Sequence, residues 1–317
     1  MLTDRTVPQA AADSLRVAVI VPVRDGGEVW RRTAASIRAQ LRRPDHVLVV
    51  DSESGDDSAA VARENGFELL PIAARDFDHG GTRQMAARRC GDFDVLVYLT
   101  QDAVLADPGA LGALLRVFDD AQVAVAYGRQ LPRPVAGPIE AHARLFNYPP
   151  GSQRRTLADA QRLGMKAAFT SDSFCAYRRA DLLAVGGFPE RVISSEDMLV
   201  AARVLQAGKA VAYVAEACVV HSHAYTLAQE LRRYFDIGVL HADHAWLLRD
   251  FGAPEGEGMR FVLSEWRFLW RRAPWRLPAA GLRTLGKWFG YRLGRAHRRL
   301  PPAWCRSLSM HRAHWQA

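Results

Sequence analysis

The chain has 317 residues, of which 49% are hydrophobic and 24% charged, and this composition excludes the collagen-like, disordered and disulfide-rich classes. The formal net charge of +8 is uneven, because residues 259–317 hold thirteen Lys or Arg and a single acid, while the preceding residues carry a net charge of −4. Four scattered cysteines without a Cys-x-x-Cys pair, no signal peptide and no apolar run of about 18 residues lead us to expect a cytoplasmic chain that spans no membrane.

Strand-like and helix-like segments alternate along the first hundred residues. Residues 17–23 form a short apolar, largely β-branched run, as in strands that are covered on both faces of a parallel sheet. Apolar residues then recur at helical spacing from Val29 to Leu41. Further strands are expected at 46–50, 67–71 and 95–99, and further helices at 57–65 and 82–90. The alternation predicts a parallel α/β sheet of the nucleotide-binding style.

The second half of the chain is less regular. Five prolines interrupt residues 129–164, which predicts a long, mobile connection over the site. An ordered segment at 171–177, helices at 179–185 and 196–206, a strand at 210–214 and one long helix at 227–248 are expected to follow. The glycine-rich stretch 252–258 marks a boundary, so we expect one domain at 14–255 and a basic, tryptophan-rich helical extension at 256–317.

Polar clusters follow three of the expected strands, at the edge where an open α/β sheet binds its ligands. They are Asp51-Ser52 and the residues up to Ser58, Thr100-Gln101-Asp102, and His221-Ser222-His223. Two more lie at expected helix starts: His79-Gly80-Gly81-Thr82-Arg83, placed in a loop leading into a helix, and Ser194-Ser195-Glu196-Asp197.

Taken together, these segments resemble the inverting GT-A glycosyltransferases of family 2, which use nucleoside-diphosphate sugars. The resemblance spans roughly residues 17–250 and is carried by Val21-Pro22-Val23-Arg24-Asp25, Val50-Asp51, Asp102, Gly186-Gly187-Phe188 and Glu196-Asp197. Within that group, the segments 77–83, 99–103, 220–223 and 233–236 are similar to the rhamnosyltransferases of bacterial surface polysaccharides.

The resemblance implies a GT-A fold with a mostly parallel central sheet and a C-terminal helical extension. It also implies a metal-dependent, inverting transfer of a sugar to a glycan or lipid-linked acceptor in surface-polysaccharide (O-antigen) synthesis. The implied donor is dTDP-L-rhamnose. A catalytically inert nucleotide-sugar or glycan-binding subunit is the alternative, because the family's Asp-x-Asp is altered here.

The residues at the ends of the first two expected strands are assigned to binding of the donor base. Asp51 can accept the imide N–H of uracil or thymine, with Ser52 beside it. The backbone of Pro22, Val23 and Arg24 would flank the base. The alternative is that Asp51 only caps the turn that follows it.

Asp102 is the candidate ligand for Mg²⁺ or Mn²⁺, since such hard cations take carboxylate oxygens and neutralise a diphosphate. The family usually has Asp-x-Asp at this position, whereas this chain has Thr100-Gln101-Asp102, so the first acid is missing. That loss removes a ribose or sugar contact, which a deoxyribose donor needs less. His221 or His223 can supply a further ligand, although a histidine beside a strand is more often structural.

Inversion at an anomeric carbon needs a carboxylate that deprotonates the acceptor hydroxyl. The family's Glu-Asp pair corresponds to Glu196 and Asp197, and Asp197 takes this role. The alternative is that the two acids simply favour the start of a helix.

The remaining candidates concern the diphosphate and the acceptor. Gly80 and Gly81 would let backbone approach the donor, with His79 and Arg83 beside its diphosphate or sugar, or they form a plain turn. His223 and Arg233 are assigned to the acceptor or diphosphate, although Arg233 also suits a solvated helix face.

The C-terminal segment holds six of the eight tryptophans together with its arginines. This composition suits helices on an anionic membrane surface, here the inner face of the cell membrane. The alternatives are a helical hairpin packed on the body and a nucleic-acid surface. We expect no nucleic-acid partner, because no module motif is present and the body is net negative.

Overall fold

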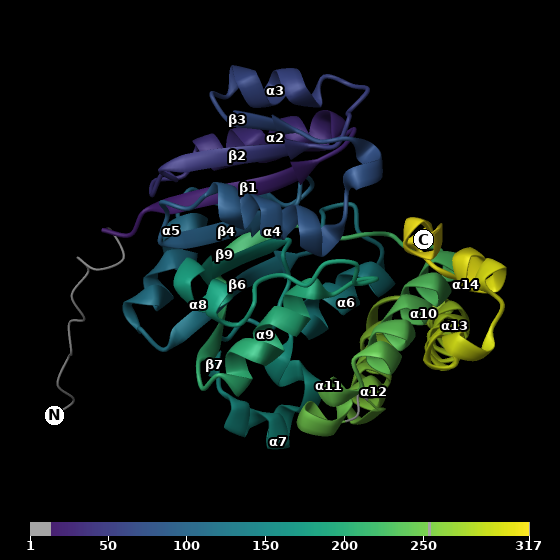
Figure 1. Ribbon diagram of the computed structural model, residues 1–317. Coiled ribbons are helices and arrows are strands. Elements are labelled where there is room, and N and C mark those ends of the chain that lie inside the picture. Colours follow the sequence, from purple (N-terminus) through teal and green to yellow (C-terminus); the bar gives the residue numbers. More distant parts are fainter. Residues whose placement is uncertain (1–13, 253–254, 317) are drawn as a thin grey trace, which may run out of the picture.

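The computed structural model describes residues 14–252 and 255–316, and a nine-stranded sheet forms its centre (Figure 1). The sheet order is β3-β2-β1-β4-β8-β6-β9-β5, with β7 also paired to β9. The strands are β1 (Val17–Val23), β2 (His46–Asp51), β3 (Glu68–Pro71), β4 (Val95–Leu99), β5 (Val104–Leu105), β6 (Val123–Leu131), β7 (Gln153–Arg155), β8 (Phe174–Arg178) and β9 (Ala210–Val220).

The first four strands are parallel, so the carboxyl ends of β1, β2 and β4 lie at one edge of the sheet. Strand β8 runs antiparallel to both of its neighbours, β4 and β6, while β6 and β9 are parallel. The predicted α/β fold with a mostly parallel central sheet is confirmed, and its parallel strands β3, β2, β1 and β4 lie side by side.

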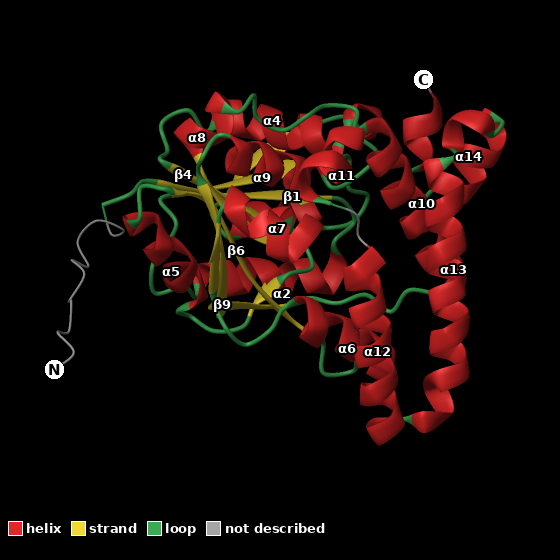
Figure 2. Ribbon diagram, turned by 90° about the horizontal axis from the view of Figure 1, so that it is seen from below, coloured by secondary structure: helices red, strands yellow, loops and turns green. Residues whose placement is uncertain are grey.

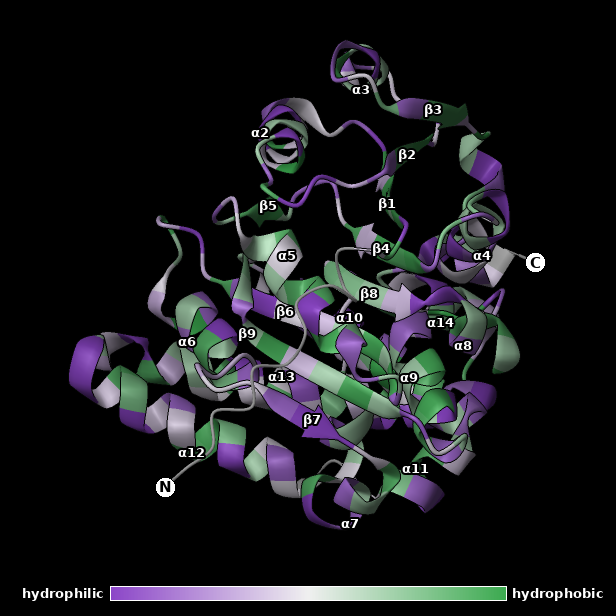
Figure 3. Ribbon diagram, turned by 90° about the vertical axis from the view of Figure 1, so that its left-hand side faces the viewer, coloured by the Kyte–Doolittle hydropathy of each residue, from purple (hydrophilic) through white to green (hydrophobic). Residues whose placement is uncertain are grey.

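Helices cover both faces of the sheet. They are α2 (Gly27–Arg38), α3 (Ser58–Glu64), α4 (His79–Arg89), α5 (Ala110–Leu115), α6 (Pro138–Asn147), α7 (Ala160–Leu163), α8 (Arg179–Ala184), α9 (Glu196–Gln206), α10 (Leu227–Asp243), α11 (Ala245–Phe251), α12 (Glu255–Arg272), α13 (Leu277–Arg295) and α14 (Pro302–Leu308). Side chains alternate along β1, so Val19 packs in the core with α2, α3 and α5, whereas Ile20 packs with α4, α8, α9 and α10. Figure 3 shows β2 and β9 mostly in the green of hydrophobic residues, as expected for strands covered on both faces.

The prediction that residues 129–164 form a long, mobile connection was wrong. This stretch holds the end of β6, helix α6, strand β7 and helix α7. Pro138 is the first residue of α6, where a missing N–H costs nothing, so this proline starts a helix rather than breaking one. The single helix expected at 227–248 is divided at His244, whose backbone leaves helical geometry (φ −114°, ψ 56°). Buried Leu240, Leu247 and Phe251 continue the apolar face across this break, which hides it from the sequence pattern.

The predicted C-terminal helical extension is confirmed, and its helix α13 lies along α10 in Figures 1 and 2. Glycines make this approach close. A Cβ on Gly290 would stand 2.2 Å from the carbonyl oxygen of Leu231, and one on Gly294 would stand 2.0 Å from that of Phe235. The two backbones therefore touch, and α13 is an integral part of the packed structure. The predicted domain boundary, between residues 255 and 256, falls at the start of α12, next to residues 253–254, which lie outside the described part of the chain, and the division into two domains stays a prediction. None of the helices in the described ranges is long and apolar enough to cross a bilayer.

Candidate active site

The residues predicted to hold the donor base lie at the carboxyl edge of β1, β2 and β4. Gln101 joins two of these ends, because its Oε1 accepts from the Arg24 N–H (2.7 Å) and its Nε2 donates to the Arg24 carbonyl (3.0 Å). The Ser52 N–H donates to the Val23 carbonyl (2.9 Å), and Pro22 pairs with β2 in the register of the sheet. The sheet therefore brings the predicted base-binding residues together.

Asp51 is buried at the end of β2, and its carboxylate accepts from the hydroxyl (2.5 Å) and the N–H (3.3 Å) of Ser54. It thus caps its own turn, and its contact with a base stays a prediction. The buried hydroxyl of neighbouring Ser52 has no hydrogen-bond partner among the described residues, which leaves a polar atom available at this edge.

Asp102, His221 and His223 form a compact cluster of possible cation ligands. Their ligand atoms lie within 4.8 Å of one another. Asp102 Oδ1 is 3.3 Å from His221 Nε2, and Asp102 Oδ2 is 3.7 Å from His223 Nε2. Burial on its own raises the pKa of Asp102, but hydrogen bonding and the charges of the two histidines outweigh it, so the pKa lies well below its ordinary value.

The hydrogen bonds around His221 fit a cation at this cluster. Gln130 Nε2 donates to Ser171 (2.8 Å), and Gln130 Oε1 accepts from Arg144, which fixes the orientation of the amide. His221 Nδ1 lies 3.0 Å from that Oε1, which can only accept, so Nδ1 is the donor. When the ring is protonated, Nε2 also donates to the Asp102 carboxylate. When the ring is neutral, Nε2 turns its lone pair toward that carboxylate, and a divalent cation between the two acceptors would satisfy both.

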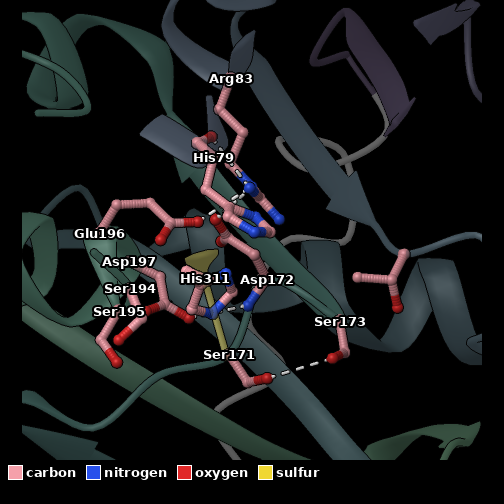
Figure 4. A pocket seen from close by; sticks show the side chains of 11 residues that line it. His79, Arg83, Ser171, Asp172, Ser173, Ser194, Ser195, Glu196, Asp197 and His311 are labelled. Atoms are coloured by element: carbon pink, nitrogen blue, oxygen red, sulfur yellow. Dashed lines mark hydrogen bonds and ion pairs between the residues drawn. The ribbon is translucent and has the colours of Figure 1, made fainter. Parts of the chain in front are cut away.

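A second cluster, of three carboxylates around one arginine, lines a cavity of about 180 Å³ (Figure 4). The Arg83 guanidinium is buried and lies 2.8 Å from Asp172 and 2.8 Å from Glu196. Asp197 makes no such ion pair with any described residue: its two oxygens accept from the N–H groups of Asp172 (3.1 Å) and Met198 (2.7 Å). It also lines both this cavity and a larger one beside it.

The two predicted catalytic acids have opposite pKa shifts. Burial raises the pKa of Asp197 well above its ordinary value, and the negative charges of Asp172 and Glu196 act in the same direction. Burial also acts to raise the pKa of Glu196, but the Arg83 guanidinium outweighs it and the pKa is lowered. Because a raised pKa makes a carboxylate a better proton acceptor near neutral pH, this geometry favours Asp197 over Glu196 as the base. Ser195, just before them, has left-handed backbone (φ 59°), and strain of this kind clusters at functional sites.

The segment 79–83 forms the first turn of α4, so its placement in a loop was wrong. The Asp78 carboxylate caps the start of the helix by accepting a hydrogen bond from the Gly81 N–H (2.7 Å). The apolar pattern of the sequence did not indicate that the helix begins this early. A Cβ on Gly80 would stand 1.7 Å from the Pro189 carbonyl oxygen, so tight packing accounts for this glycine. Arg83 is held by its two carboxylates, and contacts of His79, Gly80, Gly81 and Arg83 with the donor stay a prediction.

His311, which the sequence analysis missed, reaches this cavity from the C-terminal segment. Its ring lies 5.0 Å from that of His79, edge to face. Burial lowers the pKa of His311 to about 4, and the charge of His79 acts in the same direction. The imidazole is therefore neutral at physiological pH. Only the fold brings residue 311 beside residue 79, and no spacing in the sequence indicates it.

The larger cavity, of about 760 Å³, begins at Asp197 and Ser195 and extends to α6, α10, α12 and α13. Its volume lies in the range of ligand pockets. His221, His223 and Arg233 line it, so the residues predicted for metal, diphosphate and acceptor share one space. The Arg233 guanidinium lies over the ring of Tyr225, 5.5 Å from its centre, and the residue is exposed, so its role at the acceptor or diphosphate stays a prediction beside the solvated-face alternative.

Comparisons with known proteins agree with this geometry. Residues 18–186 match the family described as "Glycosyl transferase family 2". The chain is 44% identical to the O-antigen chain rhamnosyltransferase RfbN of Salmonella typhimurium, over 95% of this chain and 96% of that protein. It is also 44% identical to the O-antigen chain rhamnosyltransferase WbaN of Salmonella anatum, over 94% and 95%.

Solved structures share the fold at low sequence identity. The mannosyltransferase PcManGT of Pyrobaculum calidifontis, solved with GDP-Man and Mn²⁺, superposes with a TM-score of 0.56 at 19% identity, over 95% of this chain and 86% of that one. S. aureus TarS residues 1–349, solved with UDP-GlcNAc, gives a TM-score of 0.53 at 15% identity, over 90% and 92%. The predicted GT-A fold is confirmed.

Proposed function

The chain belongs to glycosyl transferase family 2, and on this basis we propose that it is an inverting rhamnosyltransferase of O-antigen synthesis. It moves L-rhamnose from dTDP-L-rhamnose to a glycan or lipid-linked acceptor. The observation that carries the proposal is the position of Asp197, a carboxylate of raised pKa and without an ion pair, at the junction of two cavities. The rhamnosyltransferase names of two relatives that are 44% identical over nearly the whole chain support the choice of sugar.

The chemistry proposed for this chain is a single displacement. The acceptor hydroxyl attacks the anomeric carbon of the donor, a new C–O bond forms there, and the bond to the nucleoside diphosphate breaks. Asp197 receives the proton of the hydroxyl. Arg83 forms an ion pair with Glu196 and another with Asp172. The negative charges of these two acids help to keep the pKa of Asp197 high.

The leaving group is a diphosphate, and Asp102, His221 and His223 would hold the Mg²⁺ or Mn²⁺ that neutralises its charge. The fixed tautomer of His221 supports this assignment. That PcManGT was solved with Mn²⁺ supports it as well.

The nucleoside is proposed to be deoxythymidine. Where the family has the first acid of Asp-x-Asp, this chain has Thr100, and the amide of the next residue, Gln101, binds the Arg24 backbone. The site thereby lacks a carboxylate at that position, and a donor without a ribose 2′-hydroxyl needs it less. Pro22, Val23, Asp51 and Ser52 would hold the base.

The enzyme is proposed to work at the inner face of the cell membrane, held there by its C-terminal helices. Four large apolar side chains are exposed on α12 at spacings of four, three and four residues: Met259, Leu263, Trp266 and Trp270. Trp275 follows in the connection to α13, where Leu282, Leu285, Trp288 and Phe289 are exposed as well. Exposed arginines flank them, including Arg267, Arg271, Arg272 and Arg276. Exposed tryptophan beside arginine suits the boundary of an anionic bilayer.

Release of free nucleotide by the purified protein tests the proposal. Incubation with dTDP-rhamnose, dTDP-glucose and UDP-glucose should give the fastest hydrolysis and the tightest binding with dTDP-rhamnose. Tighter binding of UDP-glucose in competition calorimetry would overturn the donor assignment. Binding of nucleotide sugars without any hydrolysis or transfer would favour an inert binding subunit instead.

A further inference from the structure

Glu265 on α12 is a buried carboxylate whose hydrogen-bonding capacity is unused in the described part of the chain. Its side chain is 1% exposed, and neither of its oxygens has a hydrogen-bond partner among the described residues. It lines the larger cavity. Because an unpartnered buried carboxylate costs free energy of folding, its presence calls for a ligand that satisfies it.

The charges around Glu265 do not satisfy it, because they are directed at Glu230 on α10. Arg283 Nη1 lies 3.0 Å from Glu230 Oε1, and Lys287 Nζ lies 3.8 Å from the same atom. Within the described part of the chain, no ion pair reaches Glu265. Burial raises its pKa, and the charge of Lys287 only partly opposes this. Glu230 Oε2 is also buried and has no hydrogen-bond partner in residues 14–252 and 255–316, so unused acceptor atoms stand on two sides of this end of the cavity.

Aromatic rings complete this end of the cavity. Phe261, one turn before Glu265, and Tyr234 on α10 both line it. Lys287 Nζ lies 4.9 Å from the centre of the Phe261 ring and 5.8 Å from that of Tyr234. Carboxylate oxygens that accept from hydroxyls, together with aromatic faces that pack on C–H surfaces, are the groups that recognise a carbohydrate.

The nucleoside base of the donor, the other reactant of the proposed reaction, has its place elsewhere. Pro22, Val23, Arg24, Asp51 and Ser52, which are proposed to hold the donor base, line neither of the two cavities described above. The cavity that holds Glu265 does contain Asp197, the base that must meet the acceptor hydroxyl. Arg283 and Lys287 at this end of the cavity are paired with Glu230, so an anionic ligand would have to compete with that carboxylate for them.

We propose that the end of the larger cavity between α10, α12 and α13 is a carbohydrate subsite, in which Glu265 accepts hydrogen bonds from hydroxyls of the acceptor glycan. The inference rests on the proposed function and adds to it the part of the chain that recognises the acceptor. The C-terminal helices thereby select the glycan.

The test compares Glu265→Gln and Glu265→Met with wild type and with Glu257→Gln. Glu257 lies on the same helix, is partly exposed, and pairs with Lys166 and Arg260 outside the subsite, so it is a matched control. Three quantities are measured: the melting temperature, nucleotide release from dTDP-rhamnose without acceptor, and binding and transfer with octyl glycosides of glucose, galactose, mannose and rhamnose. Binding is followed by saturation-transfer NMR.

We expect both Glu265 variants to melt at or above the wild-type temperature, because a cost of burial is removed, and to hydrolyse donor within twofold of wild type. The KM of the best glycoside should rise at least tenfold with kcat little changed, and Glu257→Gln should behave as wild type. Loss of stability in Glu265→Met, an unchanged KM, or binding of none of the four glycosides to wild type would overturn the subsite. Absence of both donor hydrolysis and transfer in wild type would instead count against the proposed function.

Discussion

Asp236 on α10 accepts a hydrogen bond from the backbone N–H of Met310 at 2.9 Å, and this contact places the next residue, His311, in the cavity that holds the proposed catalytic acids. The two partners are 74 positions apart in the sequence. The C-terminal segment is thus one wall of the candidate active site, in addition to its proposed role at the membrane.

The Asp236 carboxyl should make stability depend on pH. Burial raises its pKa to about 6, above the value of an unfolded aspartate. A raised pKa means that the folded state favours the protonated acid, so stability is full below about pH 4 and falls as the pH rises through about 6. Asp236→Asn should therefore melt several degrees higher than wild type at pH 7.5 and at an equal temperature at pH 4. A lower melting temperature at pH 7.5 would show that the charged form is required.

Replacement of His311 by alanine should reduce transfer by about tenfold or more while the melting temperature changes little, because its neutral ring lines the reaction cavity. The matched control is His314→Ala, three residues later, a half-buried histidine that lines neither of the two cavities. Transfer is measured with saturating dTDP-rhamnose. Equal rates for the two variants would exclude a role of His311 in the reaction.

Asp197→Asn keeps the shape of the base but removes its ability to take a proton. We expect transfer to fall by roughly 10²-fold or more with donor affinity within a fewfold of wild type. Glu196→Gln should instead weaken the Arg83 network and lower the melting temperature. If Asp197→Asn transfers at nearly the wild-type rate, Glu196 is the next residue to examine as the base.

Asp102→Asn and His221→Ala should fail at donor binding. Both remove a proposed cation ligand, so calorimetry should show donor affinity reduced at least tenfold in the presence of Mn²⁺. Chelation of the cation should reduce the affinity of wild type to that of the variants. Wild-type protein that binds and transfers equally well in EDTA would contradict metal dependence.

Membrane binding is best tested with point variants, because removing residues 259–317 would also strip α13 from α10 and remove His311. Trp266→Gln together with Trp270→Gln should reduce flotation with phosphatidylglycerol vesicles, and high salt should reduce it for wild type. The control is Leu41→Gln, because Leu41 is an apolar residue that is 83% exposed and lies far from residues 259–317 in the sequence. If wild-type protein does not bind the vesicles, or binds RNA in preference to them, these helices have a structural or nucleic-acid-binding role instead.

The sequence by itself determined the parts of the site that depend on local order. An apolar run such as 17–23 is a strand wherever it is buried, and the polar residue after such a run lies at the strand's end. Asp51 and Asp102 could be placed for this reason. Asp197 could be placed because two acids after serines start a helix.

Only the tertiary structure decided which distant groups meet. Gln130 sets the tautomer of His221, Asp236 anchors the segment that carries His311, and Glu265 lies unpartnered in the cavity that begins at Asp197. A hydrogen bond or a buried carboxylate depends on three-dimensional distance and on the exclusion of water, and neither is written in the spacing of residues along the chain. The glycines of α13 show the same limit. Their spacing is visible in the sequence, but the need for glycine at Gly290 and Gly294 comes from the backbone of α10, which lies 2.2 and 2.0 Å from a Cβ added at these two positions.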